Sequence, residues 1–311
     1  MTKESVDLSV DLGRLKLRNP VMPSSGTFGY GVEFADFFNL NDLGAIVVKG
    51  TTLHPRLGNF QRRFTEIAGS AEISTIGLQN VGVERFVKEK LPLLRKFETP
   101  VIVNIAGERV EEFAKITEVL DRAEGVGGIE VNLACPNVQG GGLQFSADRD
   151  ATFQVVRAVR NATKLPIIAK LCPTITDVSI LAKVCEEAGA DAICPIYAVM
   201  GMVIDIQTRK SKLGKNILAS VGGPWMKPIA LKLAWQAARA TKIPVIGGGG
   251  ITCAEDAIEF FIAGATAVQV GIYNFVDPKV TIRVIEGIKS YLMDHGKRRI
   301  GDLVGSFEMT S

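Results

Sequence analysis

Short runs of apolar, often β-branched residues recur along the chain, and segments with helical periodicity lie between them. Eight of these runs predict strands: Pro20–Gly26, Ala45–Thr51, Pro100–Gly107, Gly128–Cys135, Pro166–Pro173, Ala192–Ala198, Pro244–Ile251 and Ala267–Tyr273. Amphipathic segments predict helices over Val83–Phe97, Val110–Glu124, Ala151–Thr163, Asp177–Ala188, Lys227–Thr241, Ala254–Ala263 and Lys279–His295. Almost wholly apolar strands are typical of a parallel sheet covered by helices, and eight strand–helix units close into a barrel. We therefore expect an α/β fold of the (β/α)8 TIM barrel class.

The opening segment and two long connections depart from this repeat. Residues Val6–Pro20 alternate apolar and polar positions around Gly13, which predicts an antiparallel β-hairpin at the bottom of the barrel. Leu53–Gln79 and Met200–Trp225 are longer than ordinary connections, and we expect them to form inserted loops over the C-terminal face that help to build the substrate site. Since no hinge-like linker interrupts the chain, residues 1–311 are expected to form a single domain.

Composition excludes several classes of protein. With 47% hydrophobic and 22% charged residues the chain is globular rather than disordered, and its net charge of +3 gives no reason to expect a polyelectrolyte partner. No basic stripe with interleaved aromatic residues suggests nucleic-acid binding. No apolar run reaches the length of a membrane helix, and the first twenty residues lack a secretory signal, so we expect a cytoplasmic protein without a membrane partner.

The cysteines give no metal or disulfide pattern. They are five in number and contain no CxxC pair, which argues against a disulfide framework, structural zinc or an iron–sulfur cluster held by this chain alone. We therefore expect no metal site.

Polar residues end several of the otherwise apolar strands. In a barrel of this class the active site lies at the carboxyl ends of the strands, so these residues are the natural catalytic and binding candidates. They are Ser24 and Ser25, Lys49, Asn104, Asn132 and Cys135, and Lys170. Any one of them could be a hydrogen-bonded strand cap, but their recurrence on successive strands favours a common site.

Glycines end the last two predicted strands. Gly247–Gly250 precede a predicted helix start near Ala254, and Gly271 ends the eighth strand. Exposed backbone amides beside a helix N-terminus bind anions, and the loops after strands seven and eight of a barrel are the usual phosphate position. The pattern is neither GxGxxG nor GxxxxGK[ST], which disfavours a dinucleotide fold or a P-loop ATPase.

Two lysines and two asparagines around a phosphate-anchored ligand suit flavin mononucleotide (FMN). Ammonium groups stabilise the negative charge of a reduced flavin ring, and carboxamides bond its polar edge. Cys135 is then the candidate acid/base, because a thiol exchanges protons close to neutral pH. The alternative for a cysteine is a small buried apolar residue, which is our expectation for Cys172, Cys185, Cys194 and Cys253.

Motifs over most of the chain resemble the class 1B dihydroorotate dehydrogenase catalytic subunit family. They are SSGTFGYG at Ser24–Gly31, VVKGTT at Val47–Thr52, IGLQN at Ile76–Asn80, VNIAG at Val103–Gly107, NLACPN at Asn132–Asn137, TITD at Thr174–Asp177, GMVIDI at Gly201–Ile206, GGPWMKP at Gly222–Pro228, GGGGI and VQVG. The resemblance implies a homodimer that works beside an electron-transfer subunit carrying FAD and a [2Fe–2S] cluster. It also implies hydride transfer between a substrate carbon–carbon bond and flavin N5.

The resemblance further implies a set of site residues. Those expected to bind FMN are Ser24, Ser25, Lys49, Thr51, Asn104, Asn132, Lys170, Ile196, Gly222, Gly223, Gly249, Gly250, Gly271 and Ile272. Those expected to contact substrate are Lys49, Ser74, Ile76, Gly77, Leu78, Asn132, Asn137, Tyr197 and Ala198. Cys135 is expected to be the catalytic base, with Lys170 and Asn132 beside it.

Three positions depart from the family pattern. Ser74 stands where an asparagine is expected, and Tyr197–Ala198 stand where an Asn-Thr pair is expected. Each lost hydrogen bond to a planar carboxylated pyrimidine would cost roughly 1–3 kcal/mol of binding. The chain is therefore either a dihydroorotate dehydrogenase in which other groups such as Ser220 compensate, or a paralogue acting on a dihydropyrimidine, a hydantoin or an enone.

A function of another class is a non-redox, phosphate-binding isomerase or aldolase. It would use Lys170 as a Schiff-base nucleophile or Lys49 as a general base, and it would leave the strand-end asparagines without a role.

Overall fold

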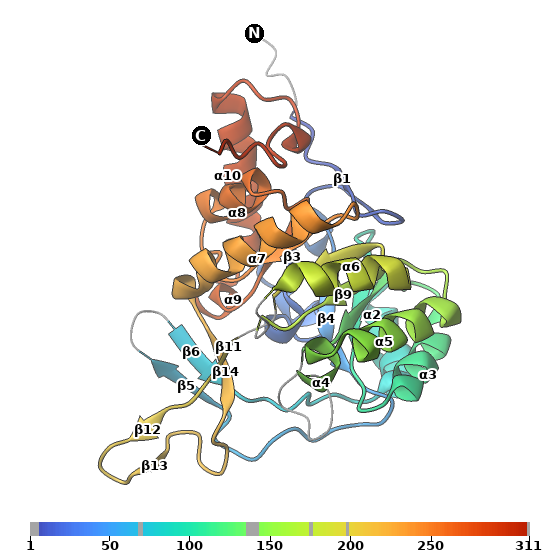
Figure 1. Cartoon of the computed structure of the whole chain (residues 1–311), viewed down its shortest axis with the longest axis vertical. Coiled ribbons are helices and arrows are strands. Elements are labelled where there is room, and N and C mark those ends of the chain that lie inside the picture. Colours follow the sequence, from blue (N-terminus) through green and yellow to red (C-terminus); the bar gives the residue numbers. More distant parts are fainter. Residues whose placement is uncertain (1–5, 68–70, 135–142, 174–176, 197–198, 310–311) are drawn as a thin grey trace.

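The computed structural model of the chain describes residues 6–67, 71–134, 143–173, 177–196 and 199–309. Each of the eight predicted strands is present and is shorter than the apolar run that predicted it (Figure 1). In chain order they are β3 (Val21–Pro23), β4 (Ile46–Thr51), β7 (Val101–Ile105), β8 (Gly128–Asn132), β9 (Ile167–Lys170), β10 (Ala192–Cys194), β15 (Ile246–Gly248) and β16 (Ala267–Val270).

The eight strands run parallel around a barrel. Five pair continuously in the order β10-β9-β8-β7-β4, and three in the order β15-β16-β3. Backbone hydrogen bonds join the two arcs at both seams: Gly44 N donates to Val21 O at 2.9 Å, and Ile193 N donates to Pro244 O at 3.0 Å. The predicted (β/α)8 barrel is therefore confirmed, with a ladder that is sparser at its two seams.

Helices cover the outside of the barrel, as predicted. They are α1 (Val83–Arg85), a π-helical turn over Phe86–Lys90, α2 (Leu91–Leu94), α3 (Val110–Asp121), α5 (Arg149–Ala162), α6 (Val178–Ala188), α7 (Lys227–Ala240), α8 (Ala254–Ile262) and α10 (Val280–Asp294). Two short helices, α4 (Leu143–Ala147) and α9 (Tyr273–Val276), were not expected. In α3, Phe113, Ile116 and Leu120 are fully buried at a helical spacing, which shows why this face packs on the barrel.

The predicted N-terminal hairpin closes the bottom of the barrel. Strands β1 (Val10–Asp11) and β2 (Lys16–Leu17) pair antiparallel, and Gly13 turns between them with φ of +76°. Leu12, Leu15 and Leu17 are buried in one apolar cluster with residues of the barrel strands, among them Met22. The hairpin therefore stabilises the barrel opposite the catalytic end.

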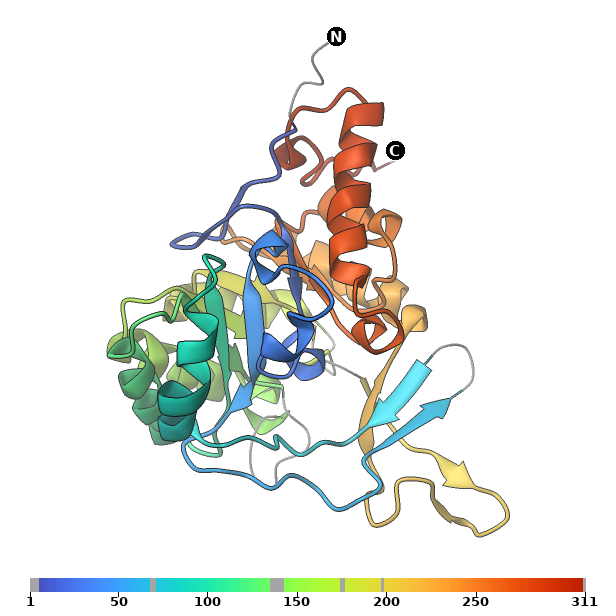
Figure 2. The same ribbon diagram turned by 180° about the vertical axis from the view of Figure 1, so that it is seen from behind.

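The two long connections form a second, antiparallel sheet rather than irregular loops. β5 (Phe64–Ile67) and β6 (Ala71–Ser74) come from the first connection, and β11 (Val199–Gly201) and β14 (Ala219–Gly222) from the second. They pair in the order β11-β14-β6-β5, and we call them the insertion sheet. A hairpin of β12 (Ile204–Asp205) and β13 (Lys210–Ser211) extends from it, and Figures 1 and 2 show both at the end of the molecule away from β1.

Candidate active site

A cavity lies between the carboxyl ends of the barrel strands and the insertion sheet. Its empty volume is about 1410 Å³, including space open to solvent. Many residues expected at the site line it: Ser24, Ser25, Lys49, Ser74, Ile76, Gly77, Leu78, Asn104, Asn132, Ile196, Gly222, Gly223, Gly249, Gly250, Gly271 and Ile272. The barrel and the insertion sheet therefore bring together residues that are 248 positions apart in the sequence, from Ser24 to Ile272.

Six expected site residues stand apart from this lining. Thr51 and Lys170 are buried but are not part of the cavity wall, and the Thr51 hydroxyl bonds the carbonyl of Lys49. The contact with FMN expected of Thr51 therefore stays a prediction. Cys135, Asn137, Tyr197 and Ala198 lie outside the described residues.

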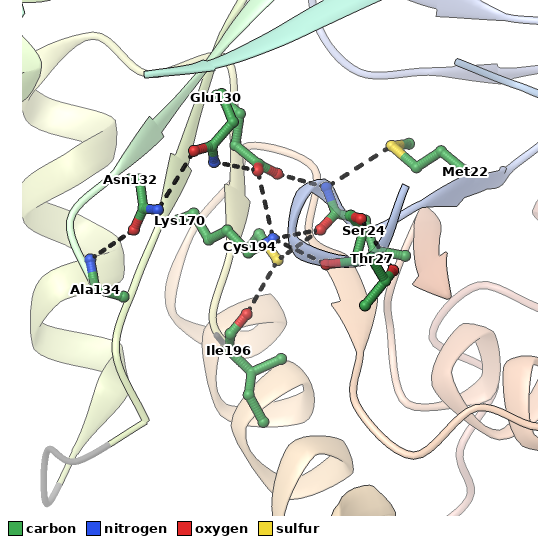
Figure 3. Close-up of polar contacts among 11 residues, drawn as sticks. Met22, Ser24, Thr27, Glu130, Asn132, Ala134, Lys170, Cys194 and Ile196 are labelled. Carbon is green, nitrogen blue, oxygen red and sulfur yellow. Dashed lines mark hydrogen bonds and ion pairs between the residues drawn. The ribbon is translucent and has the colours of Figure 1, made fainter. Parts of the chain in front are cut away.

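Lys170 belongs to a buried polar network beneath the cavity (Figure 3). Its Nζ lies 3.3 Å from Glu130 Oε1 and donates to Gln269 Oε1 at 2.7 Å and to Ser24 Oγ at 3.3 Å. The Lys170 and Glu130 side chains are 3% and 0% exposed. A charge pair this deeply buried needs further hydrogen bonds to offset desolvation, and Gln269 supplies them to both partners.

The same network orients the two strand-end asparagines. Asn104 Nδ2 donates to Glu130 Oε1 at 2.6 Å, and Asn104 Oδ1 accepts from Asn132 Nδ2 at 3.3 Å. Asn132 Oδ1 in turn accepts from the backbone N–H of Ala134 at 3.1 Å. Glu130 and Gln269 were missed by the sequence analysis, although each is a polar residue with apolar neighbours on both sides within its strand. That pattern was the available signal.

Lys49 presents a cation to another side of the cavity. Burial lowers the pKa of its ammonium group, an effect that nearby Glu33 opposes. The ammonium nitrogen lies 5.7 Å from the centre of the Tyr30 ring, a cation–π distance. Lys49 therefore offers a partly desolvated positive charge to a bound anionic or electron-rich group.

The glycine run after β15 lies against the start of α7. A Cβ at Gly250 would come within 2.6 Å of Lys227 N and 2.8 Å of Pro224 O, and its φ of +77° already favours glycine. Only glycine therefore fits this close approach to α7, and Gly248, Gly249 and Gly250 line the cavity without side chains. A bare backbone beside a cavity is the usual cradle for a phosphate.

The start of α8, which the sequence analysis included in this anion site, is already capped. Asp256 Oδ2 accepts from the N–H groups of Thr252 and Cys253 at 2.8 and 3.2 Å. Burial alone would raise the pKa of Asp256, but hydrogen bonds from Lys227 and Thr252 lower it to about 2. The anion site therefore depends on the glycine backbone rather than on this helix N-terminus.

The insertion sheet adds a carboxyl group that the sequence analysis did not anticipate. Glu72 of β6 lines the cavity and is 6% exposed, and its Oε1 accepts from Ser74 Oγ at 3.3 Å. Burial raises the pKa of Glu72 to about 7, which the bond from Ser74 only partly opposes. Glu72 can therefore change its charge near neutral pH.

The described cysteines differ in exposure. Cys172, Cys185 and Cys194 are buried as expected, and burial raises the pKa of Cys194, which lines the cavity, to about 11. Cys253 is exposed, so the expectation of burial was wrong there. The reason is its position at the N-cap of α8, outside the apolar face of the helix.

The fold and the cavity together define a class of protein. A (β/α)8 barrel that collects a lysine, amides and a glycine loop around one cavity at the carboxyl ends of its strands has the features of a barrel enzyme that binds a small molecule. Among the described residues, no cluster of His, Cys, Asp and Glu could hold a metal ion, and no helix is long and apolar enough to cross a membrane.

Comparison with known proteins gives the family. The sequence model described as Dihydroorotate dehydrogenase matches residues 7–292, so the chain belongs to the dihydroorotate dehydrogenase family. It is 48% identical to the dihydroorotate dehydrogenase B (NAD(+)) catalytic subunit of Geotalea uraniireducens (strain Rf4), covering 96% of this chain and 98% of that one. It is 49% identical to the subunit of that name in Pelobacter propionicus, covering 97% and 99%.

A solved structure agrees on the fold. The DHODH of Eimeria tenella, solved in complex with ferulenol, superposes with a TM-score of 0.82 at 20% identity and covers 98% of this chain and 90% of that one. The match of the family model and the two relatives, rather than this structure, confirm the family expected from the motifs, and the chain is an oxidoreductase of a flavin-dependent family. These relatives do not favour the non-redox isomerase or aldolase.

Proposed function

We propose that this chain is an FMN-dependent oxidoreductase that oxidises dihydroorotate, the substrate in the name of its relatives. The observation that carries the proposal is the cavity itself, which joins a bare glycine cradle to a wall of Lys49, Asn104 and Asn132. The phosphate of FMN would lie at the glycine cradle, and its planar ring would lie against the amides of the wall. We also infer that residues 1–311 act as one FMN-binding domain.

The residues present fit this cofactor. The backbone of Gly249, Gly250 and Gly271, which lines the cavity, would hold the phosphate. Glycine is required at the first two, because Cβ atoms there would meet neighbouring groups at 3.0 Å or less. Asn104 and Asn132 would bond the polar edge of the ring, and Lys170 would lie behind Ser24 as a buried positive charge. When bound, FMN supplies a hydride acceptor at N5.

Cys135 is proposed as the base that takes the second hydrogen of the substrate, as a proton. It directly follows Ala134, whose N–H is bonded to Asn132 Oδ1. The strand-end amide of Asn132 therefore connects the flavin-binding wall to the start of the segment that carries the thiol. In this proposal Lys170 and Asn132 position the ring, and Cys135 moves the proton.

Flavin bleaching tests the proposal. The purified protein should be yellow, and anaerobic dihydroorotate should bleach the flavin absorbance within the mixing time of a stopped-flow instrument or soon after. Cys135→Ser should keep its flavin while bleaching slows by orders of magnitude. Colourless protein that takes up no added FMN would refute the cofactor, and an unchanged rate in Cys135→Ser would refute the role of the thiol.

The partners proposed are those that the relatives' name suggests. A catalytic subunit of the B type needs an electron-transfer subunit, which we propose carries FAD and a [2Fe–2S] cluster and exchanges electrons with NAD. We propose a homodimer of this chain at the centre of that assembly, in the cytoplasm. Co-purification with the second subunit and light scattering of the complex test these points.

A second candidate substrate class is a neutral dihydropyrimidine or hydantoin, or an enone. It is supported by Ser74, which lines the cavity where the family pattern expects an asparagine, and by the buried carboxyl of Glu72 next to it. Failure of dihydroorotate to bleach a flavin-loaded protein, together with bleaching by dihydrouracil, would favour this class.

A further inference from the structure

The insertion sheet presents a polar cluster to the cavity. In the β14–β6 pair, Ser220 lies opposite Ser74 and Gly222 lies opposite Glu72. Cross-strand partners and residues two apart share a face, so all four lie on the same side, and all four line the cavity. The other side packs Ile73 into a small apolar cluster, which fixes this face of the sheet toward the cavity.

Two oxygens of this polar cluster lack partners. Among the residues that the structure describes, nothing hydrogen-bonds Glu72 Oε2 or Ser220 Oγ, and both atoms are buried. Glu72 is 6% exposed, and no lysine or arginine of the described chain is ion-paired with it. Buried polar atoms are normally satisfied, so an unpaired carboxyl oxygen in a cavity indicates a missing ligand group.

We propose that Glu72, supported by Ser74 and Ser220, is a specificity-determining residue that accepts a hydrogen bond from a ring N–H of the substrate and disfavours a substrate carboxylate in this part of the cavity. The inference rests on the proposed flavin oxidoreductase function. Of the two substrate classes proposed there, it favours the second, neutral cyclic amides or ureas with an unsubstituted N–H, over dihydroorotate.

The chemistry of the three groups supports an N–H ligand. An ionised carboxylate only accepts hydrogen bonds, whereas the two hydroxyls can both donate and accept. A ring that carries N–H beside C=O matches this set, because its N–H meets Glu72 while its carbonyl meets a serine. A carboxylate placed here would face a like charge in a poorly solvated cavity, where repulsion is stronger than in water. Glycine at 222, opposite Glu72, is required by the fold, because a Cβ there would clash with the side chain of Ile272.

The test compares two ligands that share a ring. Orotate and uracil carry the same ring N–H and C=O groups, and only orotate has a carboxylate. Their affinities for the FMN-loaded protein are measured by calorimetry at pH 8, for the natural chain and for Glu72→Gln. The control is Glu66→Gln, which makes the same change of charge on β5, at an exposed position directly opposite Glu72 that does not line the cavity.

Glu72→Gln should raise the affinity for orotate relative to uracil at least tenfold, while Glu66→Gln changes the ratio less than twofold. A ratio within twofold of the natural protein in Glu72→Gln would overturn the inference, as would failure of both ligands to bind the natural chain and the variant. Flavin content separates the two proposals: protein without FMN fails the proposed function, whereas loaded protein with an unchanged ratio fails only the role of Glu72. Ser74→Asn should likewise favour orotate.

Discussion

Removing either Lys170 or Glu130 alone should strongly destabilise the protein, because the other charge is then left buried without its partner. Both side chains are at most 3% exposed, so water cannot solvate a charge left without its partner. Breaking such a pair typically costs about 3–5 kcal/mol. In Lys170→Met, Glu130 keeps its bonds from Asn104 and Gln269, so we expect the lower end of that range, about 3 kcal/mol.

A double-mutant cycle measures the coupling. Lys170→Met, Glu130→Gln and the double variant are unfolded in urea and followed by far-UV circular dichroism. The double variant carries neither charge. Its loss in free energy of unfolding should therefore be smaller than the sum of the two single losses, by about 2 kcal/mol or more. Arg56→Met, which breaks the more exposed Arg56–Glu108 pair, should show no measurable loss. Single losses below about 1 kcal/mol, or strictly additive losses, would refute the argument.

Three further outcomes are expected. Gly250→Ala should lose bound flavin, because the new Cβ would meet backbone at 2.6 Å. Gly301→Ala, whose new Cβ would have nothing within 4 Å, should retain its flavin. The flavin absorbance of the two purified proteins tests this. The raised folded-state pKa of Glu72, about 7 against 4.5, means that the contribution of Glu72 to the free energy of unfolding of the flavin-free protein is largest below pH 4.5 and falls as pH rises to about 7. Glu72→Gln should therefore be more stable than the natural protein above pH 7, by on the order of 3 kcal/mol. A difference in the free energy of unfolding between the two proteins that does not change with pH would contradict this. Leu17→Ala, a truncation at a 2% exposed position of the N-terminal hairpin, should cost about 2–5 kcal/mol in chemical unfolding, and a loss under about 1 kcal/mol would argue against the packed barrel bottom.

The sequence predicted the barrel because its strands are buried on both sides and read as continuous apolar runs. The insertion sheet escaped prediction because its strands are only three or four residues long and alternate between a cavity face and a small apolar cluster. Their pairing also joins β6 to β14 across the sequence, and a local pattern cannot reveal such a partner.

The site was predictable where polar residues end strands, as with Lys49, Asn104 and Asn132. The network beneath it was not, because Glu130 and Gln269 lie on β8 and β16 and meet only when the barrel closes. The capping of α8 by Asp256 was likewise not predicted, since the sequence alone does not show which backbone N–H groups a side chain will accept hydrogen bonds from. Interactions across the barrel, rather than along one element, account for what was missed.

The two seams of the barrel have a dynamic consequence. Lys49, Asn104 and Asn132 belong to the five-stranded arc, and Gly249 and Gly271 follow strands of the three-stranded arc, so a molecule filling the cavity touches both. A molecule that binds only when both seams are intact stabilises that form by mass action. Regions with few backbone hydrogen bonds, such as the seams, open most readily. Amide hydrogens next to Gly44 and Ile193 should therefore exchange with deuterated water more slowly once the cavity is filled, whereas those inside each arc change little.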